Sequence, residues 1–208
     1  DNGPEMLNRH PQAQRSYGSA GPLRGKKLQL WEGGIRVPAI VRWPGHTQPG
    51  SVSGVAVSGV DLLPTLCAVA GVPVPPELEL DGTDTTPVFV GERLQREVPL
   101  FWYHYKAWGG PRAVMREGRW KLVGFWDGPE RLRSDSSTMR PGDLDLIRTT
   151  ELVRFELYDL EADQGERRDV AAKNPAVFEA MRTDMVRLLA EVQADARRDW
   201  RESWLRRW

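Results

Sequence analysis

The sequence predicts an α/β layer followed by a small α+β domain, and three patterns carry this prediction. An apolar strand candidate at 36–43 is followed by a short helix candidate at 61–70, as expected where helices cover a sheet. From residue 98 onward, short segments rich in aromatic and β-branched residues indicate an antiparallel sheet. A long amphipathic segment then indicates a closing helix. We therefore expect two domains, at 1–96 and 97–208.

The composition of the chain limits its function classes. The 208 residues are 40% apolar and 28% charged, which is ordinary for a globular protein. Because 29 basic and 29 acidic residues cancel, no overall field attracts nucleic acid, and we expect no nucleic-acid partner. No run approaches the roughly 18 apolar residues of a membrane span. No signal peptide is visible, so any targeting segment would precede residue 1, and periplasmic, extracellular and cytoplasmic locations all remain open.

The first half contains one strand and one helix signal. Residues 36–43 are mostly apolar, and Asp61 is a candidate N-cap for a helix that runs to Ala70 and ends at Gly71. Cys67 is the single cysteine, which excludes an internal disulfide. We expect it to be a small buried apolar residue, since the local sequence offers no group that would lower the pKa of a nucleophilic thiol.

The second half reads as an antiparallel sheet covered by a helix. Four segments are strand candidates, at 99–105, 112–116, 119–125 and 153–160. Glu117-Gly118 is a two-residue turn candidate, and the polar stretch at 127–150 is predicted to be a long surface excursion.

The closing helix carries the most regular pattern in the chain. Asn174 is a candidate N-cap and Pro175 a candidate first helical residue. Apolar residues then recur at three- and four-residue spacing and should pack on the sheet: Val177, Phe178, Met181, Met185, Leu188, Leu189 and Val192. Trp200, Trp204 and Trp208 follow among arginines. They offer either a membrane-surface or partner-binding stripe, or a tail packed on its own or a neighbouring subunit, including self-association.

Two segments contain the candidate chemistry. Asp1 and Asn2 offer hard oxygen donors suited to Ca²⁺ or Mg²⁺, although Asp1–Pro4 taken alone reads as a simple turn, since one metal ion needs more than two ligands. Lys27 lies among glycines, where its ammonium could bind a sulfate or phosphate, or could belong to a solvated basic loop. Glu32 precedes Gly33-Gly34 and could pair with a nearby base.

Taken together, these segments resemble the sulfatase family of the arylsulfatase type, within the alkaline-phosphatase-like superfamily. The order and spacing agree over nearly the whole chain. The resemblance rests on Asp1–Pro4, Gly21–Lys27, Trp31–Pro38, Arg42–Gly45, Asp61–Leu66, Ala70-Gly71, Asp81-Gly82, Arg119–Leu122 and Glu156–Leu160.

The resemblance implies a fold, a reaction and site residues. Sulfatases have an α/β domain and a smaller domain in which a four-stranded antiparallel sheet carries a long helix. They hydrolyse sulfate esters with a formylglycine made from cysteine or serine and a bound Ca²⁺. Asp1 and Asn2 match the second pair of calcium ligands, and Lys27 matches the catalytic lysine that binds the sulfate. His104 follows a strand end and is a weaker candidate, either for substrate contact and leaving-group protonation or as a structural histidine.

One departure from the family pattern is large. The nucleophile motif, a cysteine or serine followed at two and four residues by proline and arginine, does not occur in the sequence. We therefore expect a C-terminal portion of a sulfatase that is inactive alone, with the formylglycine and the other calcium ligands upstream of Asp1. The substrate would be an aryl or carbohydrate sulfate. A phosphonate or phosphodiester hydrolase of the same superfamily and a noncatalytic binding module are the alternatives.

Overall fold

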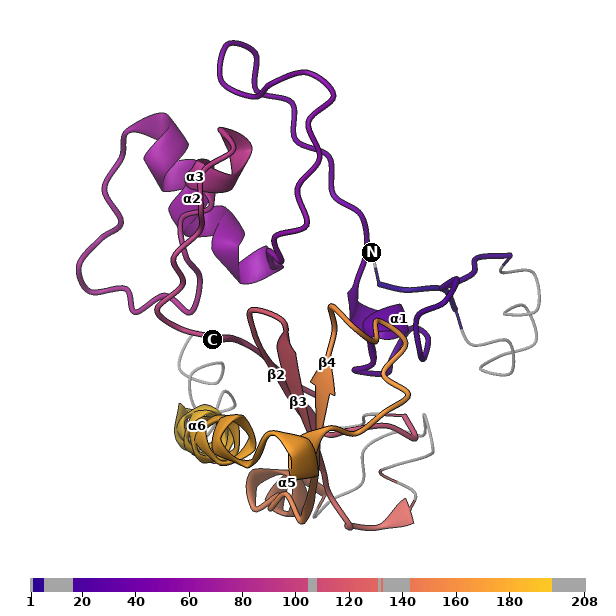
Figure 1. Cartoon of the computed structure of the whole chain (residues 1–208). Helices are drawn as coiled ribbons and strands as arrows, with labels where there is room; N and C mark the ends of the chain where they lie inside the picture. The colour runs from indigo at the N-terminus through magenta and orange to yellow at the C-terminus, as the bar shows by residue number, and fades with distance from the viewer. Residues whose placement is uncertain (1, 6–16, 105–107, 131, 133–142, 196–208) are drawn as a thin grey trace. The chain divides into compact units, whose positions relative to one another are not determined.

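The computed structural model describes residues 2–5, 17–104, 108–130, 132 and 143–195 (Figure 1). The chain forms two compact units, one of residues 1–37 together with 101–208 and the other of residues 38–100. The amino-terminal segment therefore packs with the second half of the chain. The division into domains at 1–96 and 97–208 stays a prediction about the complete protein.

The first unit is built on a four-stranded sheet with the order β1-β2-β3-β4. The strands are β1 (Leu100–Tyr103), β2 (Ala113–Glu117), β3 (Trp120–Phe125) and β4 (Arg154–Asp159), and β2, β3 and β4 pair antiparallel. The four predicted strands are thus confirmed. The predicted turn was wrong by one residue, because Glu117 pairs with Trp120 and leaves Gly118-Arg119 as the turn.

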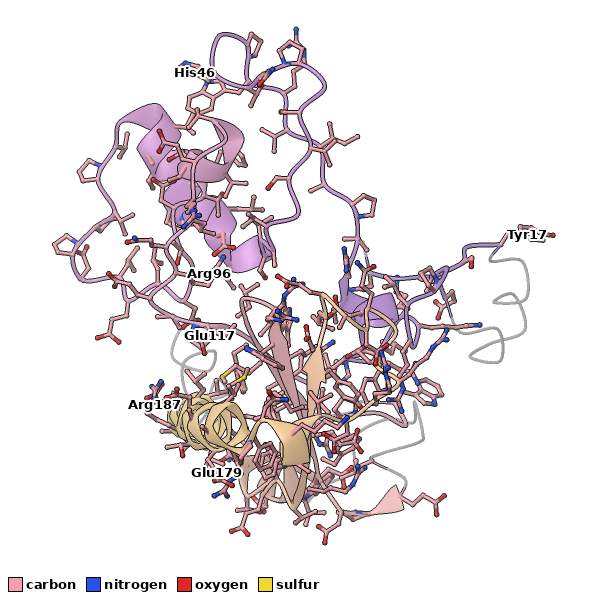
Figure 2. All side chains as sticks on the ribbon, viewed as in Figure 1. Tyr17, His46, Arg96, Glu117, Glu179 and Arg187 are labelled. Carbon is pink, nitrogen blue, oxygen red and sulfur yellow. The ribbon has the colours of Figure 1, made fainter. Side chains whose placement is uncertain are left out.

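Helix α6 (Pro175–Asp195) covers one face of the sheet (Figure 1). Its Met181 and Met185 are buried against Ala113, Met115 and Leu122. The predicted first residue and the predicted packing on the sheet are confirmed. Val192 was assigned to the packed face but is 40% exposed. Charged residues such as Glu179 and Arg187 lie on the exposed part of the helix (Figure 2).

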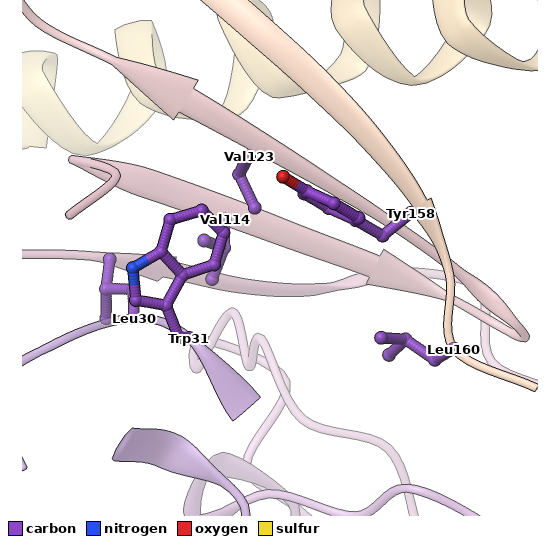
Figure 3. Close-up of a cluster of buried hydrophobic side chains, with 6 residues drawn as sticks. All are labelled: Leu30, Trp31, Val114, Val123, Tyr158 and Leu160. Carbon is purple, nitrogen blue, oxygen red and sulfur yellow. The ribbon is translucent and has the colours of Figure 1, made fainter. Parts of the chain in front are cut away.

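The opposite face of the sheet is covered by the segment that follows Lys27. Leu30 and Trp31 pack against Val114, Val123 and Tyr158 (Figure 3). The Trp31 and Tyr158 rings meet edge to face with centroids 6.0 Å apart, a favourable aromatic geometry. Since alternate residues of β2 and β3 point to opposite faces, both faces of this small sheet are buried. The helix α1 (Glu32–Ile35) follows Trp31 directly.

The polar stretch at 127–150 contains more structure than predicted. It includes α5 (Asp143–Arg148), and Leu132, Asp143 and Thr150 in it are buried. The hydroxyl of Tyr103 donates to the carbonyl of Ile147 at 3.1 Å, which ties α5 to β1. The expectation of a surface excursion was therefore wrong for these residues, because long-range contacts fold the segment back onto the sheet domain.

The second unit contains two short helices, α2 (Leu62–Ala70) after a 3₁₀ turn at Gly59–Asp61, and α3 (Thr86–Phe89). The predicted helix and its end at Gly71 are confirmed. Asp61 stands at the N-cap position, but its carboxylate turns away from α2 and binds Arg96 with two hydrogen bonds of 2.8 and 2.7 Å. Cys67 is half-buried, so the expectation of a buried apolar residue was wrong.

The strand predicted at 36–43 is not formed. These residues follow α1 without regular structure, and Ile40 is 96% exposed. A strand needs a hydrogen-bonded neighbour, and the described part of the second unit contains no strand that could pair with it.

Two further predictions concern membranes and the end of the chain. Among the described residues, no helix has both the length and the apolar character that crossing a bilayer requires. Trp200, Trp204 and Trp208 lie outside the described residues, so the interaction stripe stays a prediction.

Candidate functional site

Two backbone hydrogen bonds join the start of the chain to the Lys27 loop, defined here as residues 24–34. The N–H of Gly3 donates to the carbonyl of Gly34 at 3.0 Å, and the N–H of Lys27 donates to the carbonyl of Pro4 at 2.9 Å. Asn2 is exposed and directly precedes this junction, whereas Asp1 lies outside the described residues. The structure therefore places the Asn2 backbone next to the segment that contains Lys27.

Glycine is required at this junction because the backbones approach too closely for any side chain. A Cβ atom on Gly3 would lie 1.8 Å from the carbonyl oxygen of Gly33. A Cβ atom on Gly34 would lie 2.0 Å from the oxygen of Gln29 and 2.5 Å from that of Lys26. Such distances are far inside van der Waals contact, so the Asn-Gly and Gly-Gly dipeptides are sequence signals for this packing.

The Lys27 loop is held by its own polar groups and by the segment around Trp108. The Gln29 side-chain oxygen accepts from the Lys26 N–H at 2.9 Å, while its amide nitrogen donates to the Trp108 carbonyl at 2.9 Å. Leu28 has a φ of 72°, an uncommon conformation for a branched residue. Lys27, with its side chain half-buried, thus sits at the turn of a constrained loop.

A buried group of charges lies under α1. The Lys121 ammonium, with 0% exposure, is 2.9 Å from Glu32 Oε1 and 2.8 Å from Glu166 Oε1. The second oxygen of Glu166 accepts the N–H of Glu32 at 2.7 Å. Arg116 and Arg36 lie farther away, with nitrogens 3.7 and 3.8 Å from Glu32 Oε2. Lys121 thus neutralises part of the charge of two carboxylates inside the protein.

Burial has a direct effect on Glu166. Removal from water raises the pKa of its carboxyl, against the opposing attraction and hydrogen bond of Lys121. The ion pair with Lys121 therefore offsets part of the cost of burying this carboxylate.

The sequence predicted only part of this buried group of charges. Glu32 was a candidate partner for a nearby base, whereas Lys121 and Glu166 were not identified. A signal for Lys121 existed, because residues two apart on a strand point to the same face, and Lys121 therefore shares a face of β3 with the buried Val123. Glu166 lies in a polar segment and had no comparable signal.

His104 has a fixed backbone at the end of β1. Its N–H donates to the carbonyl of Arg112 at 3.0 Å, and the guanidinium of Arg112 donates back to the carbonyl of His104 at 3.3 Å. The imidazole is half-buried, and its role in the reaction stays a prediction.

The metal-binding capacity of the described residues is small. They contain no group of three or more His, Cys, Asp or Glu side chains that could hold a metal ion. The amide oxygen of Asn2 is a hard donor that suits Ca²⁺, but Ca²⁺ takes six to eight oxygen ligands. The described part of the chain could therefore supply only a fraction of a calcium site.

Comparison with known proteins gives one consistent answer. Residues 25–134, which include Lys27 and Lys121, match the family model described as N-sulphoglucosamine sulphohydrolase, C-terminal. Human arylsulfatase A is 35% identical over 190 residues, covering 88% of this chain and 35% of the relative. The N-acetylgalactosamine-6-sulfatase of Sus scrofa is 39% identical over 126 residues, covering 61% of this chain and 22% of the relative.

Solved structures share the fold. The structure described as Ps i-CgsB in complex with k-i-k-neocarrahexaose has a TM-score of 0.61 and 26% identity over 92% of this chain and 34% of its own. A Bacteroides thetaiotaomicron protein, from work described as the metabolism of multiple glycosaminoglycans, has a TM-score of 0.60 and 22% identity over 93% of this chain and 37% of its own.

These matches share one pattern of coverage. The chain spans about a third of the length of human arylsulfatase A and of both solved structures. The family match covers more than half of the chain and contains residues 25–34 of the Lys27 loop. On this basis the chain belongs to the sulfatase family, in the part described as the C-terminal region of N-sulphoglucosamine sulphohydrolase.

Proposed function

We propose that this chain contributes Asp1, Asn2 and Lys27 to the active site of a sulfatase that hydrolyses aryl or carbohydrate sulfate esters. The observation that carries the proposal is the pair of backbone hydrogen bonds that join residues 3 and 4 to Gly34 and Lys27. They bring the predicted metal-binding segment and the predicted sulfate-binding loop together. The names of the relatives, arylsulfatase A and N-acetylgalactosamine-6-sulfatase, support sulfate esters as the substrate class.

Lys27 has a clear role in such a reaction. Transfer of a sulfuryl group places negative charge on the bridging and nonbridging oxygens, and a fixed ammonium beside them stabilises the transition state. Because the Lys27 loop is held from several sides, little reorganisation is needed when that charge develops. Lys27 therefore binds the sulfate and acts in catalysis, and His104 contributes to substrate contact.

The proposed active site also needs a metal ion and a nucleophile. A calcium ion held partly by Asp1 and Asn2 would supply a second positive charge beside the sulfate when bound. The sequence contains no formylglycine motif, so the proposed active site takes its nucleophile from residues outside this sequence. The 208-residue chain is accordingly inactive alone.

The second unit supports a role within a larger α/β domain. Its helix α2 exposes an apolar face, with Leu62 at 62% and Leu66 at 61% exposure, and Ile40 in the unpaired segment 36–43 is 96% exposed. Apolar surface of this extent favours burial against further protein. We infer that residues 38–100 pack on the rest of the sulfatase domain, where 36–43 gains a strand partner.

A pair of neighbouring lysines gives the sharpest test. In the complete enzyme, Lys27→Ala should lower kcat/KM for an aryl sulfate by about 10²- to 10³-fold, the magnitude of losing one transition-state donor. Lys26→Ala is the matched control, since Lys26 is exposed and adjacent in sequence. It should leave turnover close to the wild-type value.

Two outcomes would contradict the proposal. Wild-type turnover in a folded Lys27→Ala enzyme would remove Lys27 from the mechanism. Efficient hydrolysis of phosphonate or phosphodiester substrates, with no turnover of sulfate esters, would assign the site to the phosphate branch of the superfamily.

A further inference from the structure

One residue outside the Lys27 loop holds both ends of that loop. The carbonyl oxygen of Glu166 accepts from the guanidinium of Arg24 at 3.0 Å, and its carboxylate accepts from the N–H of Glu32 at 2.7 Å. The loop is closed upon itself by the N–H of Gly33, which donates to the carbonyl of Arg24 at 2.6 Å. Glu166 thus fixes the distance between Arg24 and Glu32. This distance in turn determines the conformation of the loop around Lys27.

Glu166 is itself immobilised. Its side chain has 0% exposure, and its Oε1 atom pairs with Lys121 Nζ at 2.8 Å. Lys121 belongs to β3, so the sheet provides the fixed reference for the loop. The backbone φ of Glu166 is 52°, which a residue with a side chain keeps only where its surroundings impose it.

Stability alone is a poor explanation for this arrangement. Burying two carboxylates with a lysine requires removal of three charges from water, and apolar residues of similar volume often stabilise a fold as well or better. Buried ionic groups can instead specify one geometry among several. Here that geometry is the position of the loop on the sheet, because Lys121 reaches Glu32 at one end of the loop as well as Glu166.

We propose that Glu166 and Lys121 are positioning residues that hold the Lys27 loop in the geometry required for sulfate binding and catalysis. The proposal rests on the role of Lys27 proposed above. It concerns residues that touch neither the substrate nor the reacting atoms and act through the loop.

The first experiment measures Glu166→Gln in the complete enzyme. A glutamine keeps the shape of the side chain but has a single acceptor oxygen, which cannot serve both Lys121 and the Glu32 N–H. Hydrogen exchange of the amides in residues 24–34 should accelerate about tenfold or more, while the amides of Leu122 and Val123 keep their protection. The control is Glu161→Gln, which alters an exposed carboxylate paired with Arg119 and should change neither measurement.

A double-mutant cycle separates positioning from a merely structural role. Glu166→Gln should lower kcat/KM for an aryl sulfate by about ten- to a hundredfold, since misplacement of a catalytic group by about 1 Å has effects of this order. In a Lys27→Ala background the same change should have little further effect, because Glu166 acts through Lys27. If Glu166→Gln unfolds the enzyme, Glu166→Asp keeps the negative charge beside Lys121 but shortens the side chain that reaches the Glu32 N–H, and it permits the same measurements.

The outcomes distinguish this inference from the proposed function. Unchanged exchange in residues 24–34, or equal losses from Glu166→Gln with and without Lys27, would overturn the positioning role. Accelerated loop exchange in an enzyme that shows no sulfate ester turnover would leave the anchoring of the loop intact and refute the proposed function instead.

Discussion

The change Gly34→Ala tests directly whether the Lys27 loop must keep its packing. An added Cβ atom would lie 2.0 Å from the carbonyl oxygen of Gln29 and 2.5 Å from that of Lys26, whereas ordinary contact begins at 3.4 Å. The backbone on either side of Lys27 would therefore have to move by about 1 Å. Displacement of a catalytic group by this amount corresponds to about a hundredfold loss of rate. Overpacking of this kind also costs about 1–3 kcal/mol of stability.

The assay compares kcat/KM for an aryl sulfate in the complete enzyme with the folded fraction from circular dichroism. Gly54→Ala is the matched control, because its Cβ atom would meet open space and its φ is not positive. It should keep full turnover and could gain about 0.4–1 kcal/mol of stability. Wild-type turnover of Gly34→Ala would refute the packing argument. So would a loss of turnover that only follows the folded fraction.

Two further predictions concern stability. Although burial favours the neutral form of Asp61, hydrogen bonds from Arg96, Thr83 and Ser58 outweigh it and lower the pKa of this carboxyl below its ordinary 3.8. The unfolded chain then binds the proton more readily, so this stabilisation is present above about pH 4 and is lost as the pH falls through the folded-state pKa. Denaturation at several pH values should show this acid loss in the wild type and not in Asp61→Asn. Met185→Ala, which empties a fully buried site, should lower the free energy of unfolding by about 2–5 kcal/mol. Urea titration measures this loss. The control Val186→Ala, at a residue that is 48% exposed, should change the free energy of unfolding by about 0.5 kcal/mol or less.

Local patterns predicted the sheet and its helix well. Strand alternation and the three- and four-residue spacing of α6 depend on neighbours a few residues away, so the sequence alone reveals them. The role of Gly33-Gly34 in close backbone packing was not predicted, because the segments it meets are distant in sequence or lie across a turn. The strand at 36–43 failed because a strand also needs a partner, and partners are not encoded locally.

The candidate site was also predicted only in part. Its residue types were visible in the sequence, with Asn2 beside a carboxylate and Lys27 among glycines. Their proximity was not, because hydrogen bonds from Gly3 to Gly34 and from Lys27 to Pro4 join separate segments.

The sequence by itself determined the sulfatase family, the antiparallel sheet with its closing helix and the candidate Lys27. The tertiary structure alone decided what holds Lys27 in place. Glu166 reaches Glu32 across 134 residues of sequence, and Lys121 reaches it across 89. A buried lysine must find a carboxylate because an unpaired charge is too costly inside a protein, but only the folded chain selects which one.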